Sequence, residues 1–353
     1  MEGVSRKKKM ACLNAGISAG ELAKRVKEKE PLPVTFSPEE IALLCDRQKL
    51  DVAKREWEQI QKENIALIRY GREGYPKRLL DIPDPPYALY LKGSMPNRSK
   101  CVAIVGSRMC TEYGRKIAAK LGQICANAGS DVVSGMALGI DSAAHAGALR
   151  AGHPTYAVLG CGCDRCYPAS ARPMYEEMTG EKGGVISEYP PGSKPVGWHF
   201  PERNRIISGL CDILIVAEAK IRSGSLITAD CALEQGRDVY AVPGRVSDIH
   251  SAGTNGLISQ GAGILYDLDL FEEELRALCG SAAAKASGAE PVSKNGLEKE
   301  DLVVYSCLDL STKNLFDLIE ETQYPVTQVL DSLERLKRRG LVEEDRQNLF
   351  SLK

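Results

Sequence analysis

The central part of the chain alternates short apolar runs with segments whose apolar residues recur at helical spacing. The runs, between residues 101 and 244, are CVAIVG, DVVSG, TYAVLG, VISE, ILIVAE and VYAVPG. Helical spacing predicts helices after Thr111 and at 140–150, 171–179, 201–210 and 225–236. Continuously apolar strands that alternate with helices are typical of a parallel sheet covered on both faces. We therefore predict a doubly wound α/β domain that ends near residue 278.

The segments before this domain have different patterns. Residues 1–65 are expected to be helical, and Ser37-Pro38-Glu39-Glu40 supplies an N-cap, a proline at the first helical position and acids in the first turn. Residues 66–100 contain a proline-rich turn ahead of an alternating Tyr-Ala-Leu-Tyr-Leu segment. This pattern predicts a connector that feeds a strand into the sheet.

The C-terminal part follows a segment of small residues. Residues 279–296 are rich in Gly, Ser and Ala, which predicts a flexible linker. Residues 297–353 combine three helical patterns, at 298–308, 312–321 and 325–339, with a final alternating segment typical of a hairpin. Three helices and a hairpin are the arrangement of a winged-helix domain.

Composition indicates a globular chain of two or three domains. It has 353 residues, of which 43% are hydrophobic and 26% charged. The sequence contains no apolar run long enough to span a membrane, and no apolar stretch follows its basic start. We therefore expect neither a spanning helix nor a secretory signal, and a cytoplasmic location. Most of the 12 cysteines lie in apolar segments and are expected to be buried thiols.

Charge is distributed unevenly along the chain. Residues 1–100 hold 20 Lys and Arg against 14 Asp and Glu, residues 101–280 hold 16 against 20, and residues 295–353 hold 8 against 12. Any site for a polyanion in the sheet domain must therefore be a local cluster of cations. The acidic C-terminal part argues against strong DNA binding there and favours a protein-interaction or regulatory role.

Turns that contain glycine and serine follow three of the predicted strands. They are Gly106-Ser107-Arg108, the segment from Ser134-Gly135 to Asp141, and the segment from Arg222 to Thr228, which includes Ser223, Gly224 and Ser225. Ligands of open parallel sheets bind beyond the carboxyl ends of the strands, where such turns expose amides and helix N-termini to anions. Together the turns predict a phosphate-binding rim, although each alone also fits a tight turn with an N-cap.

Within this rim, Arg108 is predicted to be the principal anchor for a phosphate. The amides of Gly106 and Ser107 and the N-terminus of the helix after Thr111 would favour an anion beside it. The alternative is that Arg108 pairs with an internal carboxylate and supports the fold.

A second cluster lies in HFPERNRIISGL, residues 199–210. Phe200 precedes Arg203, Asn204 and Arg205 on a predicted helix. An aromatic ring beside guanidinium groups offers a stacking face for a base and charge for the backbone of a single strand. The alternative places Phe200 in the core and one arginine in an internal salt bridge.

Other kinds of site lack the required patterns. No G-x-G-x-x-G follows a strand, which disfavours a dinucleotide dehydrogenase, and no G-x-x-x-x-G-K-[ST] occurs, which excludes a P-loop ATPase. Cys161, Cys163 and Cys166 lack a second cysteine pair, and the four histidines show no paired spacing, so no metal or cofactor is expected. Neither a Ser-His-Asp order nor paired catalytic carboxylates can be argued from the sequence.

Several segments, taken together and in one order, resemble the DNA-processing protein A family (DprA/Smf). They are GSRMCTEYG, SGMALGIDSAAHAGAL, GCGCDRCYP, SEYPPGSKP, FPERNRIISGL, RSGSLITADCALEQGRDVYAVPG and GTNGLISQGA. The upstream YGREGYPKRLLDIPDPPYALYLKG is also similar, so the resemblance runs from about residue 66 to 270.

The resemblance implies an extended Rossmann-like domain at 66–278, between a small helical (SAM-like) domain at 1–65 and a winged-helix domain at 297–353. It implies a homodimer that binds single-stranded DNA without turnover and helps to load the RecA recombinase during natural transformation. It assigns DNA binding to Gly106, Ser107, Arg108, Ser134, Gly135, the Lys194 neighbourhood, Phe200, Arg203, Asn204 and Arg205.

An enzyme is the rival from another class. Related Rossmann-like domains, such as the phosphoribohydrolases that resemble lysine decarboxylases, act on nucleotides and carry a P-G-G-x-G-T-x-x-E loop. The corresponding stretch here, residues 223–228, lacks that motif, and no acid and base can be placed together. A nucleotide sensor that uses the same rim is a third possibility.

Overall fold

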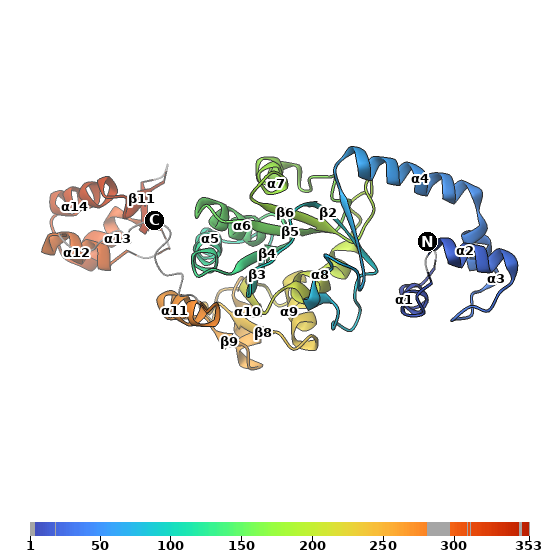
Figure 1. Ribbon diagram of the computed structural model, residues 1–353. Coiled ribbons are helices and arrows are strands. Elements are labelled where there is room, and N and C mark those ends of the chain that lie inside the picture. Colours follow the sequence, from blue (N-terminus) through green and yellow to red (C-terminus); the bar gives the residue numbers. More distant parts are fainter. Residues whose placement is uncertain are drawn as a thin grey trace.

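The computed structural model describes residues 4–17, 19–280, 297–308, 310, 312–345 and 348–352. N-terminal helices, a central sheet flanked by helices and a small C-terminal unit follow one another along the chain (Figure 1). The predicted linker, residues 279–296, lies outside the described residues except for its first two positions.

The N-terminal helices are α1 (Arg6–Asn14), α2 (Ala19–Glu28), α3 (Pro38–Cys45) and α4 (Arg47–Lys62). The predicted start of α3 is confirmed, because the Ser37 amide donates to the Glu40 carboxylate (2.7 Å) and the Glu40 amide donates to the Ser37 hydroxyl (3.2 Å). Leu22 and Phe36 belong to a small apolar core of this segment. The long helix α4 instead packs Ile60 against the sheet domain.

The central sheet of the described residues has the strand order β1-β2-β6-β5-β4-β3-β7-β8-β9. Its strands are β1 (Ala66–Arg69), β2 (Ala88–Gly93), β3 (Cys101–Gly106), β4 (Asp131–Ser134), β5 (Thr155–Leu159), β6 (Gly183–Ser187), β7 (Ile213–Glu218), β8 (Asp238–Ala241) and β9 (Gly263–Ile264). In this spatial order, every neighbouring pair of strands from β6 through β5, β4, β3, β7 and β8 to β9 is parallel, which confirms the predicted parallel sheet. β1 and β2 add an antiparallel edge, and β1 lies in the segment that the sequence predicted as a connector.

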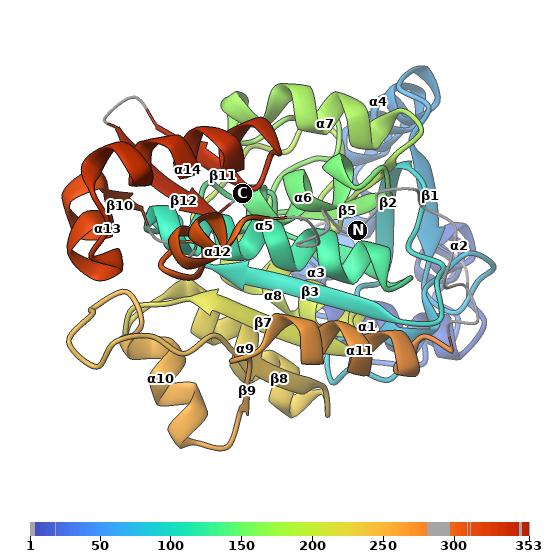
Figure 2. The ribbon, with the colours of Figure 1, turned by 90° about the vertical axis from the view of Figure 1, so that its left-hand side faces the viewer.

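Helices cover both faces of the sheet (Figure 2). One face carries α5 (Glu112–Asn127), α6 (Ile140–Arg150), α7 (Arg172–Thr179) and α11 (Leu268–Leu278), and the other carries α8 (His199–Leu210), α9 (Gly224–Glu234) and α10 (Ala252–Ser259). Two single 3₁₀ turns, η1 (Lys77–Leu79) and η2 (Ala169–Ala171), complete the domain. Along β3, Val102 and Ile104 pack towards α5 and α6, whereas Ala103 and Val105 belong to the opposite core. Because both faces are buried, the strands are apolar throughout.

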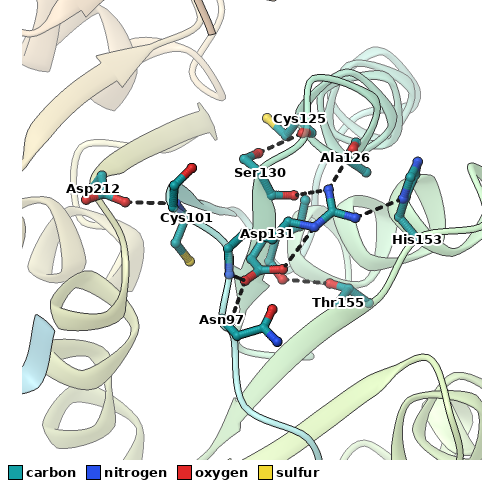
Figure 3. A network of polar contacts seen from close by, with 12 residues as sticks. Asn97, Cys101, Cys125, Ala126, Ser130, Asp131, His153, Thr155 and Asp212 are labelled. Carbon is teal, nitrogen blue, oxygen red and sulfur yellow. Dashed lines mark hydrogen bonds and ion pairs between the residues drawn. The ribbon is translucent and has the colours of Figure 1, made fainter. Parts of the chain in front are cut away.

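Charged groups at the amino ends of β3 and β4 are paired with one another (Figure 3). Asp131 is fully buried and accepts hydrogen bonds from the amides of Asn97 (2.7 Å) and Arg98 (2.8 Å), and its other oxygen lies 3.6 Å from the Arg98 Nε. Asp212 accepts from the Cys101 amide (2.8 Å) and from Arg78 (2.9 Å). These contacts tie the segment before β3 to the ends of β4 and β7.

The C-terminal unit contains α12 (Lys299–Ser306), β10 (Lys313–Asn314), α13 (Leu315–Thr322), α14 (Val326–Arg338), β11 (Val342–Glu344) and β12 (Leu349–Leu352). The three predicted helices and the hairpin are confirmed, and β10 is an additional short strand that pairs with β12. Lys116 of α5 forms an ion pair with Glu343 (2.5 Å), which joins this unit to the sheet domain. Nowhere in the described ranges is a helix long and apolar enough to cross a membrane.

Candidate nucleic-acid interface

A cleft of about 250 Å³ opens at the carboxyl end of β3. The chain places β4 on one side of β3 and β7 on the other, and ligands of doubly wound sheets bind at such a switch of strand order. The cleft is lined by residues of the predicted rim and by cations from the turn after β7. These include Gly106, Ser107, Arg108, Asn204, Lys220, Arg222, Ser223, Gly224 and Ser225. The prediction that the turns after β3 and β7 meet is therefore confirmed.

The N-terminus of α5 is occupied by a carboxylate of the protein itself. Glu218, buried at the end of β7, accepts hydrogen bonds from the Thr111 amide (2.9 Å) and the Thr111 hydroxyl (2.7 Å). The Ser107 amide donates to the Glu218 carbonyl oxygen (2.8 Å). Because these donors already have internal acceptors, the structure disfavours the anion site predicted at the Ser107 amide and this helix end.

Gly114 makes this internal arrangement possible. A Cβ atom at Gly114 would lie 2.7 Å from the Glu218 carboxylate, so no larger residue fits beside it. The Glu218 carboxylate is thus fixed against the start of α5, and Arg108 is the cation that the turn after β3 contributes to the cleft.

Hydrogen-bond donors in the turn after β4 also have acceptors inside the protein. Ser134 is fully buried, and its hydroxyl donates to the Ile104 carbonyl oxygen (2.6 Å). The Gly135 amide donates to the Asp141 carboxylate (3.1 Å). Both donors are already used inside the protein, which argues against the DNA contacts predicted for Ser134 and the Gly135 amide, and those contacts stay predictions. Asp141 is itself buried, and desolvation raises the pKa of its carboxyl group.

The N-terminus of α9 is different, because its first turn contains no acidic residue. Ser223 caps the helix by accepting from the Ser225 amide (3.4 Å), and the two serine hydroxyls lie 2.8 Å apart. Lys220 and Arg222 stand just before the cap, and neither forms an ion pair with any residue that the structure describes. A helix N-terminus with two such cations and two hydroxyls is suited to a phosphate.

A smaller slot of about 60 Å³ adjoins the cleft at the ends of β4 and β5. Phe200, in the first turn of α8, forms one wall and packs on Gly160, where a Cβ would lie 3.0 Å from the ring. The ring centres of Phe200 and Tyr167 are 5.6 Å apart. The Arg108 guanidinium lies 5.0 Å from the Phe200 ring centre. The slot therefore places flat aromatic surface next to a positive charge.

Arg108 belongs to both sites. It lines the slot and the cleft, is exposed, and forms no ion pair among the described residues. The alternative in which Arg108 supports the fold through an internal carboxylate is therefore wrong. Its remaining contact, with the Phe200 ring, leaves the guanidinium donors available.

Arg203 supports the slot from within the protein. Only 4% of its surface is exposed, and its guanidinium donates to the carbonyl oxygens of Gly135 (3.0 Å) and Val158. Burial lowers the pKa of Arg203 to about 10, and the Asp141 charge opposes that shift. Arg203 is thus cationic at neutral pH. Its Nη1 group is directed to the backbone, which favours a role in supporting the slot, and the phosphate contact predicted for it stays a prediction.

Arg205 has no part in the cleft or the slot. It is buried and pairs with Glu188 (2.6 Å) and Asp84 (3.1 Å), so the alternative of an internal salt bridge is confirmed for Arg205, and the DNA contact predicted for it is disfavoured. Successive residues of a helix point to different sides, and this separates Arg203, Asn204 and Arg205. Asn204 faces the cleft and donates to the Gly224 carbonyl oxygen (3.3 Å).

Lys194 is exposed in the loop between β6 and α8, and no described residue forms an ion pair with it. It is therefore available to an anionic ligand.

The clustered cysteines near the slot are not reactive thiolates. Cys161 and Cys163 are buried, and burial raises their pKa values to about 11 and about 12, so both thiols stay protonated at neutral pH. Among the described residues, no group of three or more His, Cys, Asp or Glu side chains could hold a metal ion.

Three contributors to this region were not predicted from the sequence. Lys220 follows the ILIVAE strand by two positions, so the rule that identified the other turns would also have found it. Tyr167 and Glu218 carried no comparable signal. Their roles depend on contacts with residues far away in the sequence.

These features define a class of protein: a Rossmann-like fold with a cation-lined cleft and an adjoining aromatic slot at the carboxyl edge of its sheet. The family model described as DNA recombination-mediator protein A matches residues 66–276. The chain belongs to this family, DprA/Smf, as the resemblance predicted.

Individual relatives agree with this assignment. The chain is 48% identical to the DNA processing protein DprA of Streptococcus pneumoniae over 189 residues, which cover 53% of this chain and 66% of that protein. It is 41% identical to DprA of Bacillus subtilis over 216 residues, which cover 60% of this chain and 72% of that protein.

Two solved structures are similar to the fold. The crystal structure of DprA from S. pneumoniae matches with a TM-score of 0.59 and 36% identity, covering 76% of this chain and 92% of that one. A DprA structure from Helicobacter pylori, whose description concerns its single-stranded DNA binding mode, matches with a TM-score of 0.55 and 30% identity. That match covers 60% of this chain and 95% of the other.

Proposed function

We propose that this protein binds single-stranded DNA along the carboxyl edge of its sheet. The observation that carries the proposal is the exposed group of cations without ion pairs among the described residues, Arg108, Lys220 and Arg222, beside an aromatic slot. A single strand presents both phosphates and unstacked bases, and a site for it needs charge and an aromatic surface together. The H. pylori relative with a described single-stranded DNA binding mode supports the same conclusion.

In the proposed complex, the cleft and the slot have separate roles. A phosphate lies in the cleft, between Lys220 and Arg222 and the Ser223-Gly224-Ser225 turn at the N-terminus of α9. A base enters the slot and stacks against Phe200. Arg108 reaches both sites, so it joins a base to the neighbouring phosphate.

The wider role that we propose is the one implied by the family. The protein protects incoming single strands in the cytoplasm and helps to load the RecA recombinase on them during natural transformation. A protein with this task needs to bind sequence-independently, and backbone charges with a stacking surface supply such binding.

We also propose that two copies associate. The outermost strand of the described sheet, β9, supports this. On and beside it, Ile264 and Tyr266 keep 50% and 72% of their surfaces exposed. Exposed apolar groups at a sheet edge favour pairing with another chain. Sedimentation of Tyr266→Lys against the unchanged protein tests the association, and equal masses for the two would contradict the role of this edge.

The domain assignment supports a binding protein with an accessory module. We propose a small helical domain at 1–65, the Rossmann-like domain at 66–278 and a winged-helix domain at 297–353. The last has three helices and the β11–β12 hairpin of such a domain, and its acidic charge favours a protein partner over DNA.

We propose further that binding occurs without turnover. The buried acids beside the cleft, Asp141 and Glu218, accept hydrogen bonds from backbone and side-chain groups of the protein and so are held in structural contacts. Incubation with nucleoside monophosphates should release no free base. Release at a rate abolished by Asp141→Asn would instead support the rival enzyme.

Direct binding assays test the main proposal. Fluorescence anisotropy of labelled single strands and of a duplex of the same sequence should show much tighter binding of the single strand, because the slot takes an unstacked base, which a duplex does not offer. The logarithm of the association constant should fall with the logarithm of the salt concentration, by about 0.7 for each neutralised phosphate. Equal affinity for both DNA forms, or a flat salt profile, would contradict the proposal.

A further inference from the structure

Trp198 is a large aromatic side chain that the fold leaves in solvent. It stands at the N-cap of α8, two positions before Phe200, and 64% of its surface is exposed. Tryptophan carries more apolar surface than most residues, so a largely exposed indole on a structured segment is a candidate contact site. Neither the cleft nor the slot includes Trp198.

The ring is nevertheless held in place. The indole packs nearly perpendicular to the His199 ring, with the ring centres 4.2 Å apart, and to the Tyr189 ring at 6.5 Å. His199 in turn stacks on Tyr189 at 3.8 Å, and its Nδ1 lies 3.0 Å from the Gly160 carbonyl oxygen. A ring that is fixed before binding loses little conformational entropy when a ligand stacks on it.

The position of Trp198 continues the proposed interface. In the sheet order β7-β3-β4-β5-β6, the cleft lies at β3 and β7 and the slot at the ends of β4 and β5. Tyr189, which supports Trp198, follows β6, the next strand in the same direction. Cleft, slot and indole therefore succeed one another along a single edge of the sheet.

Two charged residues accompany this aromatic cluster: Glu202, whose carboxylate accepts from the Tyr189 hydroxyl (2.8 Å), and a lysine of the loop. Lys194 lies in the same loop, is exposed, and has no ion-pair partner among the described residues. The loop thus supplies an aromatic ring and an available cation, the two kinds of group that also occur together at Phe200 and Arg108.

We propose that Trp198 is a second stacking platform, which holds another base of the same single strand beyond the base in the Phe200 slot. This inference rests on the proposed DNA binding and extends it to a second nucleotide. Lys194 contacts the phosphate backbone beside that base. Because every base has a flat aromatic face, the platform lengthens the bound strand without selecting its sequence.

The two tryptophans of the chain make the proposal directly measurable. Trp57 lies on α4 in the N-terminal segment, so Trp57→Phe leaves Trp198 as the sole tryptophan. Titration of this variant with labelled oligodeoxythymidylate should quench Trp198 emission in parallel with the anisotropy of the DNA label. A strand of equal length with abasic sites at every position keeps its phosphates and should leave Trp198 unquenched at matched occupancy.

Affinity measurements give the second readout. Trp198→Ala should weaken single-strand binding roughly 5- to 150-fold, as the loss of one stacked base predicts, while Trp198→Phe keeps most of the affinity. Trp57→Ala is the matched control, because Trp57 is also exposed, at 53%, and should leave binding unchanged. Circular dichroism of each variant verifies that the fold is retained.

The outcomes separate this inference from the proposed function. DNA binding seen by anisotropy, with Trp198 emission and Trp198→Ala affinity both unchanged, would overturn the platform and leave the function intact. Absence of DNA binding would overturn the function itself. A change of Trp198 emission with protein concentration alone, and none with DNA, would identify a second copy of the chain as the occupant and would also overturn the platform.

Discussion

The two ends of the parallel strands differ in how their charged side chains are paired. At the amino ends, Asp131 pairs with Arg98 and Asp212 with Arg78. Both carboxylates also accept from backbone amides (Figure 3). At the carboxyl edge, the carboxylates of Glu218 and Asp141 are turned into the protein and used by its own amides. The cations of that edge are consequently left without carboxylate partners among the described residues.

This difference indicates what each edge contributes. A buried charge is tolerated only when it is paired and hydrogen-bonded, so the amino edge holds the strands in register. Exposed cations beside helix N-termini add little to stability, but they attract anions. The same residue types thus serve stability at one edge and ligand binding at the other.

The largest effect is expected from a break in the amino edge. Arg98→Ala leaves the buried Asp131 carboxylate without its cation and should lower the free energy of unfolding by about 3 kcal/mol, the lower end for a broken buried pair, since Arg98 itself is partly exposed. Urea denaturation measures this loss. Affinity for single-stranded DNA, corrected for the folded fraction, should not change. A loss of affinity without a loss of stability would mean that the two edges are not separate.

The next effect concerns Arg108 at the carboxyl edge. Arg108→Ala should weaken single-strand binding by roughly 1.5 to 3 kcal/mol, the range for charge-assisted hydrogen bonds, with an unchanged melting temperature. Arg108→Lys should recover only part of the affinity, because the planar fork is lost. Anisotropy and thermal melting on the same preparation provide both values.

Arg205→Ala is the matched control for Arg108. Arg205 lies in the same domain but pairs with Glu188 and Asp84, so its removal should lower the melting temperature and spare the affinity. If Arg205→Ala lost affinity with an intact fold, or Arg108→Ala lost stability with intact affinity, the assignment of the two arginines would be reversed.

A smaller effect is expected from the turn before α9. The double change of Lys220→Ala and Arg222→Ala should make the slope of log K against log salt shallower by about 1.4, because each lost phosphate contact removes about 0.7. Replacement of Lys54, an exposed lysine of α4, is a suitable control and should leave the slope as it is. An unchanged slope in the double variant would remove the cleft from the interface.

The smallest effect concerns the C-terminal unit. Deletion of residues 297–353 should leave single-strand affinity within about twofold, because an acidic unit contributes no phosphate contacts. The same anisotropy assay measures it. A large loss of affinity in a truncation that retains its melting transition would show that this unit takes part in binding.

Much of the fold could be predicted from local patterns. CVAIVG, ILIVAE and the other apolar runs became parallel strands because both faces of this sheet are covered, so burial leaves a continuous signal in the sequence. The capping box at Ser37 also marked the start of its helix correctly. β1 was missed because a short antiparallel edge strand has a weak pattern, and its partner, β2, is supplied by a later segment.

The position of the site could be predicted, but the internal carboxylates that accept hydrogen bonds from its turns could not. The glycine and serine turns indicated correctly where the ligand-binding edge would be. They could not indicate that Glu218 fills the end of α5 or that Asp141 takes the Gly135 amide, since these partners come from other parts of the chain. Of the three turns predicted to bind anions, the one at α9 is therefore the best candidate.

For this protein, the sequence by itself determined the strand and helix content, the edge at which chemistry gathers, and the family. Those properties follow from periodicity and from motifs, which are local along the chain. Tertiary structure decided which cations face solvent: Arg108 remains available, whereas Arg203 and Arg205, only two positions apart, are used by the backbone and by internal acids. The distinction depends on burial and on distant partners, because the free energy of a charged side chain is set by the groups that surround it in space.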